Sequence, residues 1–139
     1  MKTEILTSKS FGNGKSRTRT SAKTLAWLGI GLILATGLIH FVEAPEAFEQ
    51  AVYKGALFLA NGIAAIFTAA AIWRRNSNFG WSLGAIVALG SIIGYAASRT
   101  VGLPGTPVME WLEPIGIASL VVEIGFVIVA AKRLNVFSR

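Results

Sequence analysis

An acid lies inside an otherwise uncharged, apolar run near the C-terminal end of the sequence. Glu123 interrupts the run from Pro114 to Ala131 and lies roughly 13 Å along a helix from Pro114, close to the middle of a membrane. The residues that share its helical face are small: Gly116, Ser119 and Ala130. Small residues let another helix approach closely, so we expect Glu123 to face the protein interior. Its carboxyl group is then either a protonatable group on a proton or substrate path, or a neutral acid that hydrogen-bonds to another helix.

Polar residues also recur along the other apolar runs. Asn61 lies at a similar depth and is spaced by seven residues from both Lys54 and Thr68, which places the three on one helical face. Taken alone, Asn61 is best explained by a hydrogen bond between helices. A polar or small face on each run predicts four helices around a polar cavity. The candidate intramembrane polar site comprises Glu123, Asn61, Ser91, Thr36 and Ser119.

Charged residues gather at one end of the runs and form a second candidate site, at the outer mouth of this cavity. Its members are His40, Glu43, Glu46, Arg99, Glu110 and Glu113. His40 and Glu43 would share a face of a continuing helix, where a metal or proton site could form. We favour instead a new helix that opens at Pro45, with Glu46 near its positive end, because a single histidine is a weak metal signal.

Arg99 follows the third apolar run in the segment SRTVGLPG, where glycine and proline end the helix. Its side chain either extends to the membrane interface or forms a salt bridge with Glu110, Glu113 or the acids near Glu43. The salt bridge would close the mouth or hold an anionic headgroup. The residues alone leave both roles open.

The chain lacks the residues that most cofactors require. It has no cysteine, which excludes disulfides, thiolate metal sites and iron–sulfur clusters, and its single histidine argues against a dihaem site within one subunit. No nucleotide-binding, zinc-protease or serine-hydrolase motif is present. We therefore expect no metal and no cofactor, and we favour a non-enzymatic protein over an enzyme.

Four apolar runs are each long enough to cross a membrane as a helix. They cover residues 24–42, 55–73, 79–98 and 114–131, and runs of 18 to 20 residues span about 27 to 30 Å. The sequence therefore predicts an all-α fold, a bundle of four transmembrane helices over residues 24–133, with no room for a separate soluble domain. A basic leader, residues 1–23, has a composition typical of disorder. A short tail, residues 134–139, follows the bundle.

The distribution of charge predicts the orientation of the bundle. Eleven of the 13 Lys and Arg residues lie on the side of the two termini, whereas five of the seven acids lie in the other loops. Because basic segments stay in the cytoplasm, we place both termini there and the two acidic loops outside. We interpret the leader as a cytoplasmic tail held near anionic lipid, with a targeting segment as the alternative, and we expect no nucleic-acid partner.

Two further patterns predict how the helices sit and pack. Tryptophans at span ends are predicted to anchor the membrane interfaces: Trp73, Trp81 and Trp111. Glycines four residues apart in the third run predict a close packing face, within the subunit or between subunits. The two pairs are Gly80 with Gly84, and Gly90 with Gly94.

The chain also resembles a family of small, uncharacterised four-helix bacterial integral membrane proteins. The similar segments are LIHFVEAPEAFEQAVYKGALFLANG, GYAASRTVGLPG and EWLEPIGIASLVVE. The resemblance covers residues 38–131 and leaves out the leader. It implies a four-helix fold in a bacterial inner membrane, and it implies no activity.

Three functions from different classes are consistent with these residues. We favour an accessory protein that binds a lipid, a quinone, another hydrophobic ligand or a partner membrane protein through the outer cavity. The alternative is a small proton-coupled transporter, acting as a homodimer, in which Glu123 carries the proton and His40 or Arg99 acts as the gate. A membrane enzyme or redox subunit that uses His40 with nearby acids is the third, and one subunit supplies too few ligands for it.

Overall fold

Four helices make up most of the described chain. The computed structural model describes residues 13–75 and 77–137. The helices are α1 (Asn13–Gln50), α2 (Val52–Arg75), α3 (Asn78–Thr100) and α4 (Pro114–Phe137). Each is long and apolar enough to cross a membrane. This confirms the predicted all-helical fold and suggests a multi-pass membrane protein.

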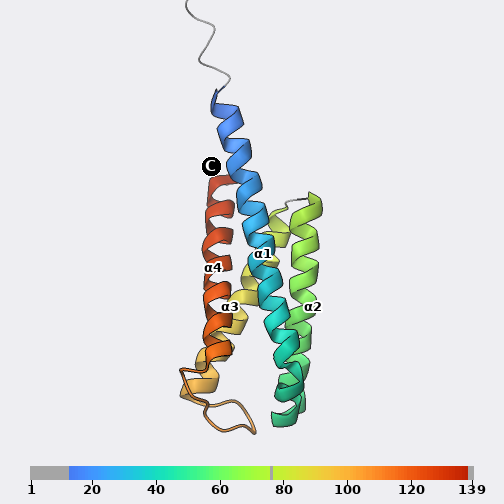
Figure 1. Cartoon of the computed structure of the whole chain (residues 1–139), viewed down its shortest axis with the longest axis vertical. Coiled ribbons are helices and arrows are strands. Elements are labelled where there is room, and N and C mark those ends of the chain that lie inside the picture. The colour runs from blue at the N-terminus through green and yellow to red at the C-terminus, as the bar shows by residue number, and fades with distance from the viewer. Residues whose placement is uncertain (1–12, 76, 138–139) are drawn as a thin grey trace, which may run out of the picture.

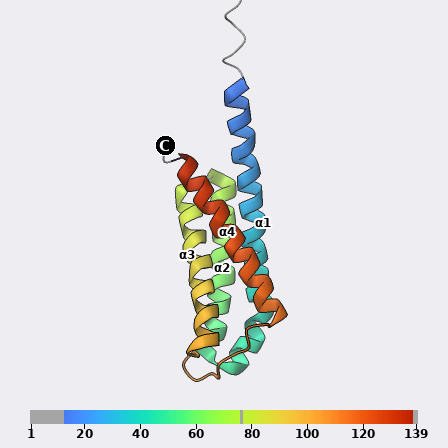
Figure 2. The ribbon, with the colours of Figure 1, turned by 90° about the vertical axis from the view of Figure 1, so that its left-hand side faces the viewer.

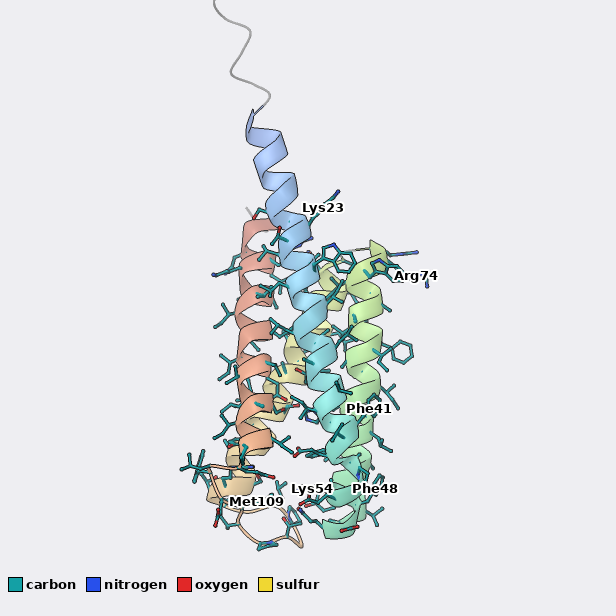
Figure 3. The ribbon with its side chains drawn as sticks, in the orientation of Figure 1. Lys23, Phe41, Phe48, Lys54, Arg74 and Met109 are labelled. Atoms are coloured by element: carbon teal, nitrogen blue, oxygen red, sulfur yellow. The ribbon has the colours of Figure 1, made fainter. Side chains whose placement is uncertain are left out.

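Successive helices run in opposite directions along the long axis of a bundle (Figure 1). α1 packs mainly against α2 and α4, and α3 packs mainly against the same two helices. The segment 101–113, which joins α3 to α4, lies at one end of the bundle (Figure 2). We call this end, which also holds the junction between α1 and α2, the loop end. The opposite end, where Lys23 and Arg74 lie, is called the basic end (Figure 3).

A hydrophobic core fills the half of the bundle towards the basic end. The Trp81 ring stacks on Phe126 with ring centroids 5.7 Å apart and planes inclined at 21°. Apolar residues from all four helices surround this pair: Ile33, Ala65, Ala69, Ile72, Ala88, Val129 and Ala130. Trp81 is fully buried, so its predicted role as an interfacial anchor was wrong. The reason lies on α1, where Gly29 leaves the space that the indole ring fills.

The two glycine pairs of α3 have different surroundings. Gly80 approaches α2 closely, and Gly84 lies against the Phe126 ring, which a Cβ at that position would overlap. Gly90 and Gly94, in contrast, have no atom within 4 Å of the place a Cβ would occupy. The first pair is therefore a packing face within the subunit, and the second pair borders open space.

α1 continues through Pro45 to its end, so the expected new helix at Pro45 was wrong. Proline removes one backbone hydrogen bond from a helix and crowds the preceding turn. Neighbouring residues hold this turn in place because Ala44 and Ala47 are buried. In addition, the Phe48 ring lies against Gly55 of α2, where a Cβ would overlap it. This burial offsets the lost backbone bond.

α1 also begins earlier than the first predicted span. It is helical from Asn13, where we expected a disordered leader over residues 1–23, and residues 1–12 lie outside the described residues. Once the apolar part of a helix has formed, each further residue adds one backbone hydrogen bond, so a basic segment can extend it. α4 likewise continues to Phe137.

Candidate functional site

A partly open cavity of about 510 Å³ lies between the four helices, in the half of the bundle towards the loop end. Pockets for small organic ligands have volumes of roughly 300 to 1,000 Å³. The cavity brings together nine of the predicted site residues: Glu123, Asn61, Ser91, Ser119, His40, Glu43, Glu46, Arg99 and Glu113. Counting along the helices, Glu43 and Glu46 border its mouth at the loop end, and Glu123 lies at its deep end.

Glu123 of α4 is 2% exposed. The hydroxyl of Ser119, one turn earlier on the same helix, donates a hydrogen bond of 2.9 Å to its Oε1 atom. This hydroxyl stabilises an acid whose burial is otherwise costly.

His40 of α1 faces Glu123 across the deep end of the cavity. Its Nε2 atom lies 3.8 Å from Oε1 of Glu123, and its ring packs against Phe58 with ring centroids 5.0 Å apart. Its Nδ1 atom lies 2.9 Å from the backbone oxygen of Thr36. Because a carbonyl oxygen only accepts, Nδ1 carries a proton, and a neutral His40 presents Nε2 as an acceptor. The pair can therefore hold one exchangeable proton, on Nε2 or on the carboxyl group.

Thr36 does not line the cavity, although we predicted it as a site residue. It is fully buried, and its hydroxyl donates to the backbone oxygen of Leu32 over 3.1 Å. Threonine often makes this bond to its own helix. Thr36 instead positions His40 through its backbone oxygen.

Asn61 and Ser91 link α2 to α3 at the deep end. The Nδ2 atom of Asn61 donates a hydrogen bond to the Ser91 hydroxyl. The Oδ1 atom of Asn61 is buried and has no hydrogen-bond partner among the described residues. An unpaired buried amide oxygen costs free energy. Oδ1 is therefore an acceptor without a donor, on a residue that lines the cavity.

Arg99 of α3 closes one side of the mouth. Its Nη2 atom pairs with Oε2 of Glu113 at 2.6 Å, and its Nε atom donates to the backbone oxygen of Glu110 over 2.8 Å. Its guanidinium carbon lies 3.6 Å from the centroid of the Tyr95 ring. Of the two roles considered for Arg99, the structure therefore shows the salt bridge. The side chain is 6% exposed, so it does not extend away from the protein. Glu110 takes part through its backbone and does not line the cavity.

Lys54 of α2 is a cavity residue that we did not include in the predicted site. It is 6% exposed, its Nζ atom donates to Oε1 of Gln50, and Nζ lies 3.4 Å from the sulfur of Met109. Lys54 and Met109 lie at the loop end of the bundle (Figure 3). The sequence did carry a signal, because the seven-residue spacing from Lys54 to Asn61 puts both on one helical face.

The cavity also reaches the side of the bundle, between α2 and α3. Leu57 of α2 and Ile86 of α3 both line the cavity and are largely exposed. Between them the walls are formed by small residues: Ala60, Ala64, Gly90 and Gly94. We call this gap the side opening. Gly90 and Gly94, which we expected to make close helix contacts, therefore border a route to the surface of the bundle.

Towards the basic end the cavity stops at the hydrophobic core. None of the buried core residues around Trp81 and Phe126 lines it. Within the described chain the cavity is thus a pocket that ends in the middle of the bundle.

No three His, Cys, Asp or Glu side chains of the described residues are grouped so that they could hold a metal ion. Comparison with known proteins adds no further guide: no family model, no curated protein and no solved structure matches the chain. The fold and cavity define a class, a four-helix protein with helices of membrane-spanning length and a largely apolar pocket that carries a few polar groups.

Proposed function

We propose that this chain is an accessory protein of a bacterial inner membrane that binds a lipid-soluble molecule in the cavity. A lipid or a quinone has the required character, an apolar body with a polar head. The role is that of a binding protein, acting alone, as a homodimer or with a partner membrane protein.

The observation that carries this proposal is the combination of the cavity with its side opening. A ligand that arrives from the bilayer could pass between Leu57 and Ile86 without crossing water. Its polar head would meet Asn61, Ser91 and Glu123 at mid-depth. Ligand sites commonly have this design, with apolar walls and a few polar groups that fix orientation.

The orientation forms part of the proposal. Lys23, Arg74, Arg75 and Lys132 are exposed at the basic end. Because basic residues are retained on the cytoplasmic side, both termini lie in the cytoplasm and the mouth of the cavity faces outwards.

A blocked cavity provides the test. Gly94→Leu would place a side chain in the open space at the cavity wall, and Gly31→Leu is a matched control because Gly31 also has open space around it and does not line the cavity. The probe is a neutral dansyl fluorophore with an N-acetylated alkylamine chain, titrated into protein in phosphatidylcholine nanodiscs. We expect Gly94→Leu to weaken binding at least about tenfold, which corresponds to about 1.4 kcal/mol. Equal binding to both variants would exclude the cavity as the site.

A second candidate function is a small proton-coupled transporter that works as a dimer. The approach of His40 Nε2 to within 3.8 Å of the Glu123 carboxyl group, where the pair could hold a proton, favours it. The core around Trp81 and Phe126 argues against it, because this core would have to open for solute to reach the other side. Proton and solute flux into liposomes should fall in Glu123→Gln if the chain is a transporter, and flux equal to that of the parent would eliminate this candidate.

A further inference from the structure

The head group of the ligand can be specified further, and this step rests on the proposed function. The deep end of the cavity is formed by hydrogen-bond acceptors. Oδ1 of Asn61 is buried without a partner among the described residues. Nε2 of His40 is an acceptor when the ring is neutral, because Nδ1 is committed to the backbone oxygen of Thr36. The carboxyl group of Glu123, when ionised, only accepts.

Two donors near these groups are already used within the protein. The Ser119 hydroxyl donates to Glu123, and Nδ2 of Asn61 donates to Ser91. A ligand whose head only accepts hydrogen bonds, such as an oxidised quinone or an ester carbonyl, would leave the Asn61 oxygen unpaired. A head that carries N–H or O–H groups would satisfy it.

The charges along the cavity favour a cation over a neutral donor. Among the described residues, His40 is the side chain within 4.0 Å of the Glu123 carboxyl that can carry positive charge. Lys54 and Arg99 are near the mouth. Two helical turns, roughly 10 Å, separate Lys54 from Asn61. Arg99 is also neutralised by Glu113.

The acids at the mouth extend this preference. Glu43 and Glu46 line the cavity beside Lys54, and neither forms an ion pair within 4.0 Å in the described chain. The ring of Phe58 lines the wall between the mouth and the deep end. An aromatic face attracts a cation that passes over it.

We propose that the cavity selects amphipathic amines, with the protonated amino group held by Glu123 and Asn61 and the apolar body in the side opening. The ammonium group would supply a counter-charge for an ionised Glu123 and an N–H donor for the Asn61 oxygen. Charge-assisted hydrogen bonds of this kind are stronger than neutral ones. Selection would therefore act on charge as well as on hydrogen-bond donors.

The test compares two probes that differ only in the group at the chain end, a charged ammonium with three N–H donors or a neutral amide with one. One is a dansyl fluorophore with a primary alkylamine chain, and the other is its N-acetylated form. Both are titrated into the parent protein in phosphatidylcholine nanodiscs, with empty nanodiscs as the baseline. We expect the amine to bind about 10- to 100-fold more tightly than the acetylated probe, the range expected for a hydrogen bond to a charged group.

Glu123→Gln then assigns the effect to one residue. The amide keeps an oxygen for the Ser119 hydroxyl, so the variant should fold. The preference for the amine should disappear. Asn61→Ala is the second variant, and it should reduce amine binding several-fold through loss of the Oδ1 acceptor.

The possible failures are distinguishable. Equal affinity of the parent for the two probes, or a preference that survives in both Glu123→Gln and Asn61→Ala, would overturn the selection of amines. If Gly94→Leu still weakens binding in that case, the cavity remains a ligand site. If Gly94→Leu weakens the binding of neither probe, the proposed function itself is excluded.

Discussion

The Nε2 atom of His40 on α1 lies 3.8 Å from Oε1 of Glu123 on α4, so the two ionisable groups of the deep end come from opposite parts of the chain. Each is held by its own helix, His40 by the backbone oxygen of Thr36 and Glu123 by the Ser119 hydroxyl. Their approach therefore depends on how α1 packs against α4.

Glu123 should be more important for ligand binding than for stability. We expect Glu123→Leu to unfold at the same temperature as the parent or higher, since an acid at the centre of a membrane helix costs about 2.5 to 3.5 kcal/mol and leucine inserts favourably. The Ser119 hydroxyl, freed from Glu123, can bond to its own helix. The variant should lose binding of the amine probe. Thermal unfolding followed by helical circular dichroism, with lipid-facing Ile124→Leu as the control, checks this; a large loss of stability would make Glu123 a structural residue.

Arg99 should fix the segment 101–113 at the mouth. Lysine cannot reproduce the two directed bonds to Glu113 and Glu110 or the stacking on Tyr95. We expect Arg99→Lys to lower the free energy of unfolding by about 1.5 to 3 kcal/mol and to speed proteolysis within the segment. Arg74→Lys, at the exposed basic end, is the matched control and should behave as the parent does. Equal proteolysis rates for the two variants would show that Arg99 does not hold the segment.

Two glycines of α1 that are two residues apart should respond oppositely to alanine. A Cβ at Gly29 would overlap the Trp81 ring, whereas Gly31 has open space. We expect Gly29→Ala to destabilise the bundle by about 1 to 3 kcal/mol and Gly31→Ala to stabilise it by up to about 1 kcal/mol through helix propensity. Thermal unfolding of the two variants decides the matter, and similar shifts in the same direction would contradict the packing of Trp81 on α1.

The orientation can be measured with single cysteines because the chain has none of its own. Pro107→Cys places a thiol in the exposed segment at the loop end, and Arg75→Cys places one at the exposed basic end. A membrane-impermeant maleimide should label position 107 in intact spheroplasts and position 75 after permeabilisation alone. The opposite pattern would invert the proposed topology.

Much of the fold follows from the sequence because the length of an apolar run determines whether it can span a membrane. The depth of Glu123 follows in the same way, since helical rise converts its distance from Pro114 into ångströms. Pro45 and Trp81 were misjudged because their outcome depends on the neighbouring helix. Ala44, Ala47 and Phe48 keep the turn at Pro45 helical. The packing of these residues against the neighbouring helix cannot be predicted from the pattern of one segment alone.

The cavity was partly predictable for a related reason. Helical periodicity placed a polar residue on each inner face, and Asn61 was expected at a depth similar to that of Glu123. The side opening was not expected, because small residues at four-residue spacing occur both where helices touch and where they separate. Gly80 and Gly84 lie where helices touch, and Gly90 and Gly94 lie where they separate. Which of the two applies depends on the register of α2 against α3, which the sequence pattern does not contain.

Native mass spectrometry of the protein released from its own membrane in mild detergent would show directly whether the cavity holds a ligand. An absorbance spectrum of the same sample would identify a bound chromophore such as a quinone. We expect the parent and Gly31→Leu to carry a small lipid-soluble molecule, an amine if the selection holds, and Gly94→Leu not to carry it. A parent protein without a bound molecule, or one that retains it equally in Gly94→Leu, would contradict the assignment of the cavity as a ligand site.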